Sequence, residues 1–320
     1  MKNKLILWLS VVLLIVLIAF MAKDLFKTGN LSQKNVYEYD LNSLRHVDDS
    51  KISHKESKQI KIEADEIHAV AVDQEDNIYV GTDKSLLVLN SEGKPINNLK
   101  LRQAASCITV MDDGNILVGM STRIDVRKPD GSLRNSFVVK GDRTYITSIA
   151  VQDTNVFVAD AGQKIIHHYN IDGNKIKEIG GKNQAEGVKG FVIPSPYFDL
   201  LIGRQGELWA VNPGRHAFEA YNFEGRQISN WNRTSMSLDG FSGCCNPSNI
   251  AMLSDGSFVT AEKGLERIKI HLPSGDFKSV VAAPDLFEPG TVGIDLAVDS
   301  KDRILVMDPA KRLIRIFEAK

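Results

Sequence analysis

Two cysteines stand side by side in the segment FSGCCNPSN, which covers residues 241–249. Gly243 precedes Cys244 and Cys245, and Asn246 with a proline follows them, which is typical of a constrained loop. Adjacent thiols can bind a soft metal such as Cu(I) or Zn(II), or can cycle between a dithiol and a disulfide. The alternative is a structural one, in which a vicinal disulfide or two half-buried thiols only shape the loop.

A metal site at this loop would need more ligands than the two cysteines. Cys107 and His68 could complete it with Cys244 and Cys245 if the fold brought them together across a channel. The sequence contains no second cysteine pair at the regular spacing of a zinc motif. Three cysteines are also too few for a disulfide framework. No cofactor is therefore predicted firmly, and a soft metal, copper or zinc, stays a hypothesis.

Several other chemistries have no motif in this sequence. It lacks a Gly-x-Ser-x-Gly elbow, a phosphate-binding Gly-x4-Gly-Lys loop and a His-Glu-x-x-His metal motif. The 39 basic and 40 acidic residues give a net charge of −1, so no electrostatic footprint for nucleic acid is present. Whether the protein is an enzyme is undecided by these observations, and a non-catalytic role is favoured.

An uncharged stretch near the N-terminus runs from Leu5 to Ala22, 18 residues in length. A helix of this length is roughly 27 Å long, close to the thickness of a hydrocarbon core. The stretch is longer than the apolar part of a signal peptide, and its end is a poor cleavage site. Lys2 and Lys4 before it favour an N-terminus in the cytoplasm. We expect a single-pass signal anchor in the cytoplasmic (inner) membrane, with the following domain facing the periplasm or the cell exterior.

Short strand-like runs recur six times along the rest of the chain. Their fourth residues are 38, 40, 52, 50 and 46 positions apart. Pairs such as Asp130-Gly131 and Asp172-Gly173 keep the same rhythm and allow the tight turn of a hairpin. The six runs, which we call the marker runs, are Asn77–Gly81, Asn115–Gly119, Asn155–Ala159, Glu207–Val211, Ser257–Ala261 and Arg303–Met307.

Each period contains four strands, because an apolar run precedes the marker run and two further strands follow it. Four antiparallel strands form one blade of a β-propeller. We therefore predict an all-β, six-bladed propeller over residues 58–320. It is preceded by a cytoplasmic segment (1–4), a transmembrane helix (5–22) and a linker (23–57). Within the linker, Val36–Tyr39 could add a strand. The last repeat ends after three strands, and Gln59–Glu63 is the natural donor of the fourth.

The repeats carry a rhythm of the form A-V-D…x-I-Y-V. It is clearest in Ala71-Val72-Asp73 with 77–80, and in Ala297-Val298-Asp299 with 303–308. This pattern resembles NHL-repeat proteins, six-bladed propellers grouped with the TolB-like fold, and the resemblance covers residues 59–320. The second and fourth repeats depart from it, and the fourth carries an insertion over 180–196. Relatives include binding scaffolds, lyases and lactonases, so the resemblance implies architecture rather than function.

In propellers of this kind, ligands sit at one mouth of the central channel, which two sets of loops line. Loops leading into the innermost strands supply His68, Cys107, Tyr145, Tyr197, Cys244, Cys245, Asn246 and Asp295. Loops between the second and third strands supply Asp83, Arg123, Asp160, Asn212, Arg215, Glu262, Lys263, Asp308 and Lys311. The candidates that we select for ligand binding are Cys244, Cys245, Asn246, Arg215, Glu262, Lys263 and His68.

Three functions are compatible with this architecture. The favoured one is a binding or scaffold module that recognises a protein or small ligand at the channel mouth, centred on the Cys244-Cys245 loop. The second is a redox or metal-handling accessory protein that uses the same cysteines. The third is a divalent-metal-dependent hydrolase or lyase. Calcium-dependent lactonases of this architecture use a Glu, an Asn and an Asp in the channel; Glu262, Asn249 and Asp295 could be assigned these roles, but their local sequences do not match.

Overall fold

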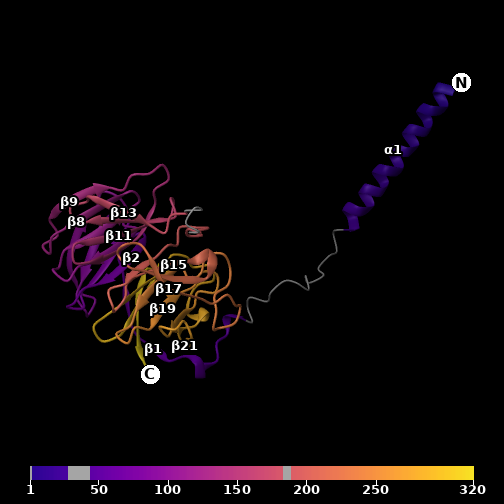
Figure 1. The fold of residues 1–320 in the computed structure, drawn as a ribbon. Coiled ribbons are helices and arrows are strands. Elements are labelled where there is room, and N and C mark those ends of the chain that lie inside the picture. The colour runs from indigo at the N-terminus through magenta and orange to yellow at the C-terminus, as the bar shows by residue number, and fades with distance from the viewer. Residues whose placement is uncertain (1, 28–43, 183–188) are drawn as a thin grey trace. The chain divides into compact units, whose positions relative to one another are not determined.

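The computed structural model describes residues 2–27, 44–182 and 189–320. The chain divides into two compact units, Met1–Leu41 and Asn42–Lys320. The second unit consists of six four-stranded antiparallel sheets arranged around a common centre (Figure 1). The predicted six-bladed all-β propeller is therefore confirmed. The predicted strand at Val36–Tyr39 lies outside the described residues.

The first three blades follow one another in the sequence, and in each the strands are paired in chain order. Blade one is β2 (Ile67–Val72), β3 (Ile78–Thr82), β4 (Ser85–Leu89) and β5 (Pro95–Lys100). Blade two is β6 (Cys107–Val110), β7 (Ile116–Met120), β8 (Arg123–Arg127) and β9 (Leu133–Val138). Blade three is β10 (Ile146–Gln152), β11 (Asn155–Asp160), β12 (Ile165–Asn170) and β13 (Lys175–Ile179).

The next two blades repeat this order, whereas the last takes its outer strand from the other end of the domain. Blade four is β14 (Leu200–Ile202), β15 (Leu208–Asn212), β16 (Ala217–Tyr221) and β17 (Gln227–Asn232). Blade five is β18 (Asn249–Met252), β19 (Phe258–Ala261), β20 (Ile268–His271) and β21 (Phe277–Ala282). Blade six is β22 (Asp295–Val298), β23 (Ile304–Asp308), β24 (Leu313–Ala319) and β1 (His54–Lys61).

The helix α1 (Lys2–Lys27) contains the predicted segment 5–22. The other helical elements described are the 3-10 turns η2 (Asp49–Lys51), η3 (Pro213–Arg215) and η4 (Pro284–Leu286). Within the described part of the chain, no helix combines the length and the apolar character that crossing a membrane requires.

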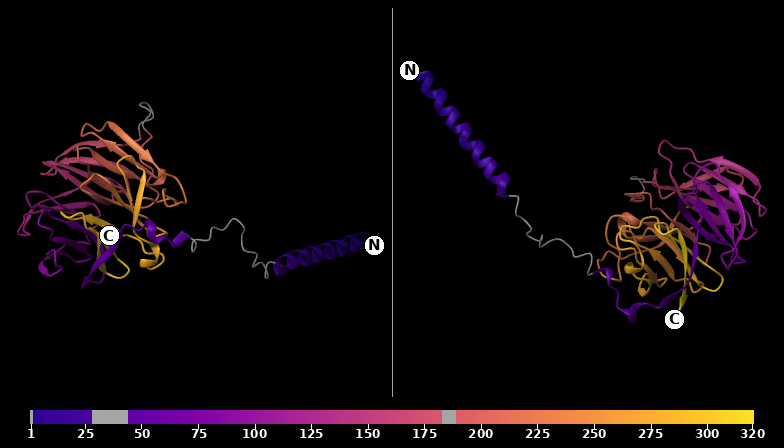
Figure 2. Two further views of the ribbon diagram at one scale, coloured as in Figure 1. Left: turned by 90° about the horizontal axis from the view of Figure 1, so that it is seen from below. Right: turned by 180° about the vertical axis from the view of Figure 1, so that it is seen from behind.

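The ring closes where β1 pairs with β24. Figure 2 shows the early strands in purple meeting the last strands in yellow at one place in the ring. Ile60 is buried opposite Ile314, and Glu56 accepts two hydrogen bonds of 2.8 Å from Arg315. The donor strand is thus confirmed, but it begins at His54 rather than at residue 59. An outermost strand has one face in water, so its charged residues are compatible with pairing.

The hydrophobic core is divided into layers between neighbouring blades. For example, Val80 of blade one and Met307 of blade six belong to one buried cluster, and Leu86 and Ile116 of blades one and two belong to the next. Similar clusters lie between the other neighbouring blades. Because each blade packs on two others, the innermost strands are held at fixed positions around the channel.

The ring closure yields a first prediction. Replacing Ile60 by Ala removes buried methyl groups from the layer between blades one and six, and we expect unfolding to become easier by about 2–5 kcal/mol. The matched control is Ile96→Ala on β5, whose side chain is 58% exposed, where the change should stay within about 0.5 kcal/mol. Urea unfolding followed by tryptophan fluorescence measures both, and equal effects would contradict this closure.

Candidate functional site

A cavity of about 1440 Å³ opens at the mouth of the channel where the innermost strands begin. Its wall is formed by β2, β6, β10, β14, β18 and β22, one strand from each blade. Tyr145 and Tyr197 lie on its rim, and Tyr145 is 44% exposed. The cavity exceeds the roughly 300–1,000 Å³ usual for small-molecule sites, so it can admit an organic ligand together with water.

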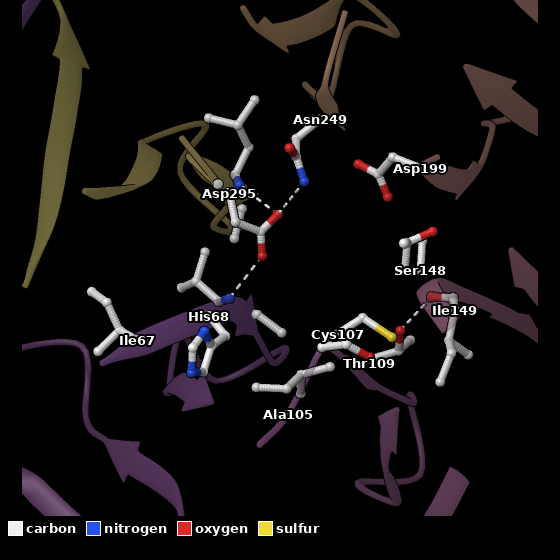
Figure 3. Close-up of a pocket in the computed structure, with 18 of the residues that line it drawn as sticks. Ile67, His68, Ala105, Cys107, Thr109, Ser148, Ile149, Asp199, Asn249 and Asp295 are labelled. Carbon is white, nitrogen blue, oxygen red and sulfur yellow. Dashed lines mark hydrogen bonds between the residues drawn. The ribbon is translucent and has the colours of Figure 1, made fainter. Parts of the chain in front are cut away.

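Six structurally equivalent positions surround the channel, and all of them except Ala69 line this cavity. Each lies near the start of its innermost strand, opposite the last residue of the neighbouring marker run. The six residues, which we call the channel ring, are Ala69, Cys107, Ser148, Asp199, Asn249 and Asp295. Figure 3 shows Cys107, Ser148, Asp199, Asn249 and Asp295 following one another around the opening.

Three ring side chains connect one blade to the next by accepting a backbone N–H. Ser148 Oγ accepts the N–H of Leu200 at 3.1 Å, and Asp199 accepts that of Ile250 at 2.8 Å. Asp295 accepts the N–H of Val70 at 2.8 Å and thereby connects blade six to blade one (Figure 3). Each innermost strand pairs with only one strand of its own sheet, so some of its N–H groups need another acceptor. The three side chains supply such acceptors.

The two ring carboxyls have pKa values well above that of an ordinary aspartate. Burial raises the pKa of Asp199 to about 6. Burial, together with the negative charge of Asp199, raises the pKa of Asp295 to about 7. Both lie deep in the molecule even though the channel leaves part of their surface accessible. Asn249 donates to Asp295 Oδ1 at 3.1 Å, and its own Oδ1 has no hydrogen-bond partner.

The cavity is acidic. Its described lining contains four carboxyl side chains (Asp65, Glu66, Asp199 and Asp295) against one arginine, Arg312, and one histidine. Asp65 and Glu66 are exposed at the edge, with 80% and 71% of their side chains accessible, so solvent screens them strongly. The effective negative charge therefore comes mainly from the deeper pair, Asp199 and Asp295.

Cys107 occupies the ring position of blade two but is not an activated thiol. It is buried, and burial raises its pKa far above the usual thiol value, with further contributions from the two ring carboxyls. The opposite residue on β7 is Gly119, where a Cβ would come within 2.4 Å of the Cys107 sulfur. The sulfur therefore packs against bare backbone and behaves as a small apolar group.

Among the seven selected candidates, His68 is the one that lines the cavity. It lies at a β-bulge near the start of β2, and its Nε2 is 3.5 Å from Glu66. From the wider set of predicted mouth residues, Cys107, Tyr145, Tyr197 and Asp295 also line it.

Cys244, Cys245 and Asn246 lie beside the cavity wall rather than on it. Their sulfurs are 3.1 Å apart and both thiols are free, with Cys244 exposed and Cys245 buried. Ser195 donates to Cys245 Sγ at 2.7 Å, and the next residues, Pro196 and Tyr197, line the cavity. Burial raises the pKa of Cys245.

Asn246 and Lys263 are joined by a reciprocal pair of hydrogen bonds. Asn246 Oδ1 accepts the N–H of Lys263 at 2.7 Å, and its Nδ2 donates to the carbonyl of the same residue at 2.9 Å. The Lys263 ammonium lies 5.3 Å from the centre of the Tyr197 ring, within cation–π range. The loop 241–249 is therefore attached to the cavity rim at two points.

Glu262 is placed differently from our expectation of a ligand group at the mouth. Its side chain is fully buried within blade five, where it pairs with Arg267 at 2.9 Å and Lys269 at 2.7 Å. Burial alone would raise its pKa, but these two cations lower it. Glu262 therefore faces Arg267 and, on the next strand, Lys269, and these two cations neutralise its negative charge.

Arg215 also lies away from the cavity. Its guanidinium is 3.8 Å from Glu219 and donates to the carbonyl of Lys189 at 3.4 Å. The predicted soft-metal site would combine Cys244 and Cys245 with Cys107 or His68, but no such group of ligands is found among the described residues. Among the described residues, no three His, Cys, Asp or Glu side chains gather closely enough to hold a metal ion.

Ser148 and Asp199 were not predicted as site residues from the sequence, and Asn249 was considered only for a lactonase role that its local sequence does not match. A usable signal exists: each channel-ring residue precedes the last residue of its marker run by 11 or 12 positions. Aligning the six repeats on that column would have placed polar side chains at one level of the channel. They were overlooked because each begins an apolar run and resembles a strand-initiating polar residue.

Comparison with known proteins supports the architecture. No family model matches the chain, and no curated protein matches it in sequence. A streptogramin B lyase structure superimposes with a TM-score of 0.61 at 10% identity, over 84% of this chain and 98% of that one. Virginiamycin B lyase from Staphylococcus aureus gives 0.56 at 13% identity, over 82% and 88%. The WD40 β-propeller domain of Doa1 gives 0.53 at 15%, over 79% of each chain.

At such identities the likeness shows the fold alone. The fold and site together define a six-bladed β-propeller with a large acidic cavity at one mouth. The finer resemblance to NHL-repeat proteins is matched by no family model and stays a prediction.

The ring carboxyls yield a prediction on pH. Because the folded-state pKa of Asp295 is raised, the folded protein binds more protons than the unfolded chain between pH 4 and 7. The stabilisation from Asp295 is therefore complete at low pH and is lost as pH rises toward 7, by at most about 1.4 kcal/mol per pH unit.

We expect Asp295→Asn to destabilise the protein more at pH 5 than at pH 7.5. Buried histidines with lowered pKa values, such as His271, contribute with the opposite sign, but they are common to parent and variant and cancel in the difference. Urea unfolding of both proteins at several pH values measures it. A difference that is constant or grows with pH would show that the Asp295 pKa is not raised.

Proposed function

We propose that this propeller is a binding module that holds a small, positively charged organic ligand in the mouth of its channel. The observation that carries the proposal is the pair of deep carboxyls, Asp199 and Asp295, facing a cavity of about 1440 Å³. A cationic group entering there would meet two acceptors with no described lysine in the lining. An anionic ligand would meet repulsion instead.

The remaining features of the cavity favour an amphipathic ligand. The inner strands contribute apolar side chains such as Ile108, Ile149 and Ile250, and two tyrosines stand on the rim. Apolar walls with a few convergent polar groups are typical of sites for organic molecules. Aromatic rings at the rim can additionally contact a cation through their faces.

Cation binding is coupled to protonation of the carboxyl pair. With pKa values of about 6 and about 7, the pair is partly protonated near neutrality. A bound cation favours the ionised forms, so binding releases protons and strengthens as pH rises.

A matched pair of probes tests this proposal. We expect phenethylamine to bind at least tenfold more tightly than 3-phenylpropionate, which has a similar shape and the opposite charge. The affinity for the amine should increase about 5- to 10-fold from pH 6 to 7 and only about twofold from pH 7 to 8, where both carboxyls become fully ionised. Isothermal titration calorimetry with the full chain in mild detergent measures both quantities.

Three variants test whether binding depends on the two ring carboxyls or only on the total negative charge of the protein. Asp199→Asn and Asp295→Asn should each weaken amine binding about tenfold or more. The control is Asp83→Asn, which removes a carboxylate paired with Lys84 outside the cavity lining and should leave the affinity unchanged. Equal affinity for both probes, or equal loss in all three variants, would overturn the proposal.

A second candidate is an acid–base enzyme of the lyase or hydrolase type. The specific observation in its favour is that Asp295, with a pKa of about 7, could exchange a proton near neutrality. One of the similar structures is a virginiamycin B lyase in a catalytically inactive form with quinupristin. Loss of quinupristin in the presence of this chain, absent in Asp295→Asn, would establish catalysis; unchanged quinupristin leaves the binding module.

Membrane attachment is also kept as a proposal, and it rests on sequence. Leu5 to Ala22 carry no charge and lysines flank them, whereas no described helix meets the requirements for crossing. If α1 is an anchor, the full chain should stay in the membrane pellet after an alkaline carbonate wash. The double variant Leu13→Arg, Val16→Arg should be released, because each arginine costs about 2.5–3.5 kcal/mol at a helix centre.

The control for this experiment is Leu13→Ile with Val16→Ile, which keeps the segment apolar and should remain in the pellet. Release of the parent protein by carbonate, to the same extent as the arginine variant, would exclude an anchor.

A further inference from the structure

The free thiols of Cys244 and Cys245 form a feature that the proposed function does not use. Their sulfurs are in contact at 3.1 Å, about 1 Å farther apart than the bonded sulfurs of a disulfide. Cys244 is exposed, whereas Cys245 is 3% exposed and lies behind it. An accessible thiol next to a protected one is the arrangement in which the first reacts and the second resolves.

We propose that Cys244 and Cys245 form a thiol–disulfide switch that exchanges with external disulfides and controls the position of Tyr197 at the cavity rim. The reaction itself is independent of the proposed ligand. Only its effect on ligand binding rests on the proposed function.

The chemistry needs a disulfide as oxidant, such as oxidised glutathione or the disulfide of an oxidoreductase. The Cys244 thiolate attacks this disulfide, forms a mixed disulfide and releases one thiolate. The Cys245 thiolate then attacks the Cys244 sulfur and releases the second thiolate. The cysteine pair loses two electrons and two protons, and the oxidant becomes two thiols.

Two contacts transmit the state of the pair to the rim. The first runs from Cys245 through Ser195, whose hydroxyl donates to the sulfur at 2.7 Å, and Ser195 is two residues from Tyr197. The second runs from Asn246 through Lys263, whose ammonium lies over the Tyr197 ring. Ser195 and Lys263 therefore both connect the cysteine loop to the same residue, Tyr197.

Oxidation changes the first contact directly. Forming the disulfide brings Cys245 Sγ closer to Cys244, and we expect this to break the hydrogen bond that Cys245 Sγ accepts from the Ser195 hydroxyl. Tyr197 keeps its backbone bond to the carbonyl of Ser195 at 2.7 Å and its contact with Lys263, but the segment loses its direct hydrogen bond to the cysteine pair. We expect residues 195–198 to become more dynamic and the cavity rim to change shape.

The test uses the full chain equilibrated in reduced and oxidised glutathione. Oxidised protein should lose 2 Da in intact mass, with the disulfide mapped to residues 244 and 245. Hydrogen–deuterium exchange of the peptide containing 195–198 should rise several-fold. Cys244→Ser should abolish both changes, and reduced Ser195→Ala should reproduce the faster exchange without any disulfide.

A pair that stays reduced in a large excess of oxidised glutathione would overturn the switch. So would a disulfide that forms while exchange at 195–198 stays unchanged, since the bond would then be structural only. Neither readout requires a ligand, so failure of amine binding leaves this result standing, and failure of the switch leaves the amine result standing.

Discussion

A carboxylate in the channel connects the last blade to the first. Asp295 accepts the N–H of Val70, while Asn249 and the N–H of Leu296 bond to its other oxygen. A propeller leaves the inner edge of every blade without a strand partner, so these N–H groups need acceptors from a neighbouring blade. Asp199 and Ser148 fill the same need in other blades. Together with the packing between blades, these bonds hold the innermost strands beside one another around the channel.

The same bonds explain why the site has unusual chemistry. A side chain that joins two blades at the channel must lie deep in the molecule, where ionisation is unfavourable. Two such carboxyls close to each other raise the pKa of Asp295 further. Asp199 and Asp295 therefore carry both the bonds between blades and the proposed cation site, so we expect substitutions there to change stability as well as ligand binding. The loop 241–249 contacts the cavity rim through Ser195 and Lys263, while its ends are bonded within blades four and five, for example Phe241 to Arg233 and Ser248 to Ala261.

The blades and their order could be predicted from sequence because each depends on local patterns. Marker runs such as Asn77–Gly81 and turns such as Asp130-Gly131 repeat with one rhythm, and the missing strand of the last blade indicated a donor near Gln59. The start of that strand was predicted five residues late, because His54–Lys58 is polar and an outermost strand shows little apolar signal. The residues that line the mouth were partly predicted, with His68, Cys107 and Asp295 among them.

The sequence by itself determined the architecture: six four-stranded blades, an acceptor strand at the end of the chain, and an adjacent pair of thiols. Only the tertiary structure decided which polar side chains share the cavity. Asp199, Asn249 and Asp295 follow one another at intervals of 50 and 46 residues in sequence, and their proximity follows from closing the ring. Glu262 has the same residue type as a ligand carboxylate, yet packing beside Lys269 and Arg267 buries it in blade five. Burial and distance, which set charge and pKa, are properties of the closed ring and not of any single repeat.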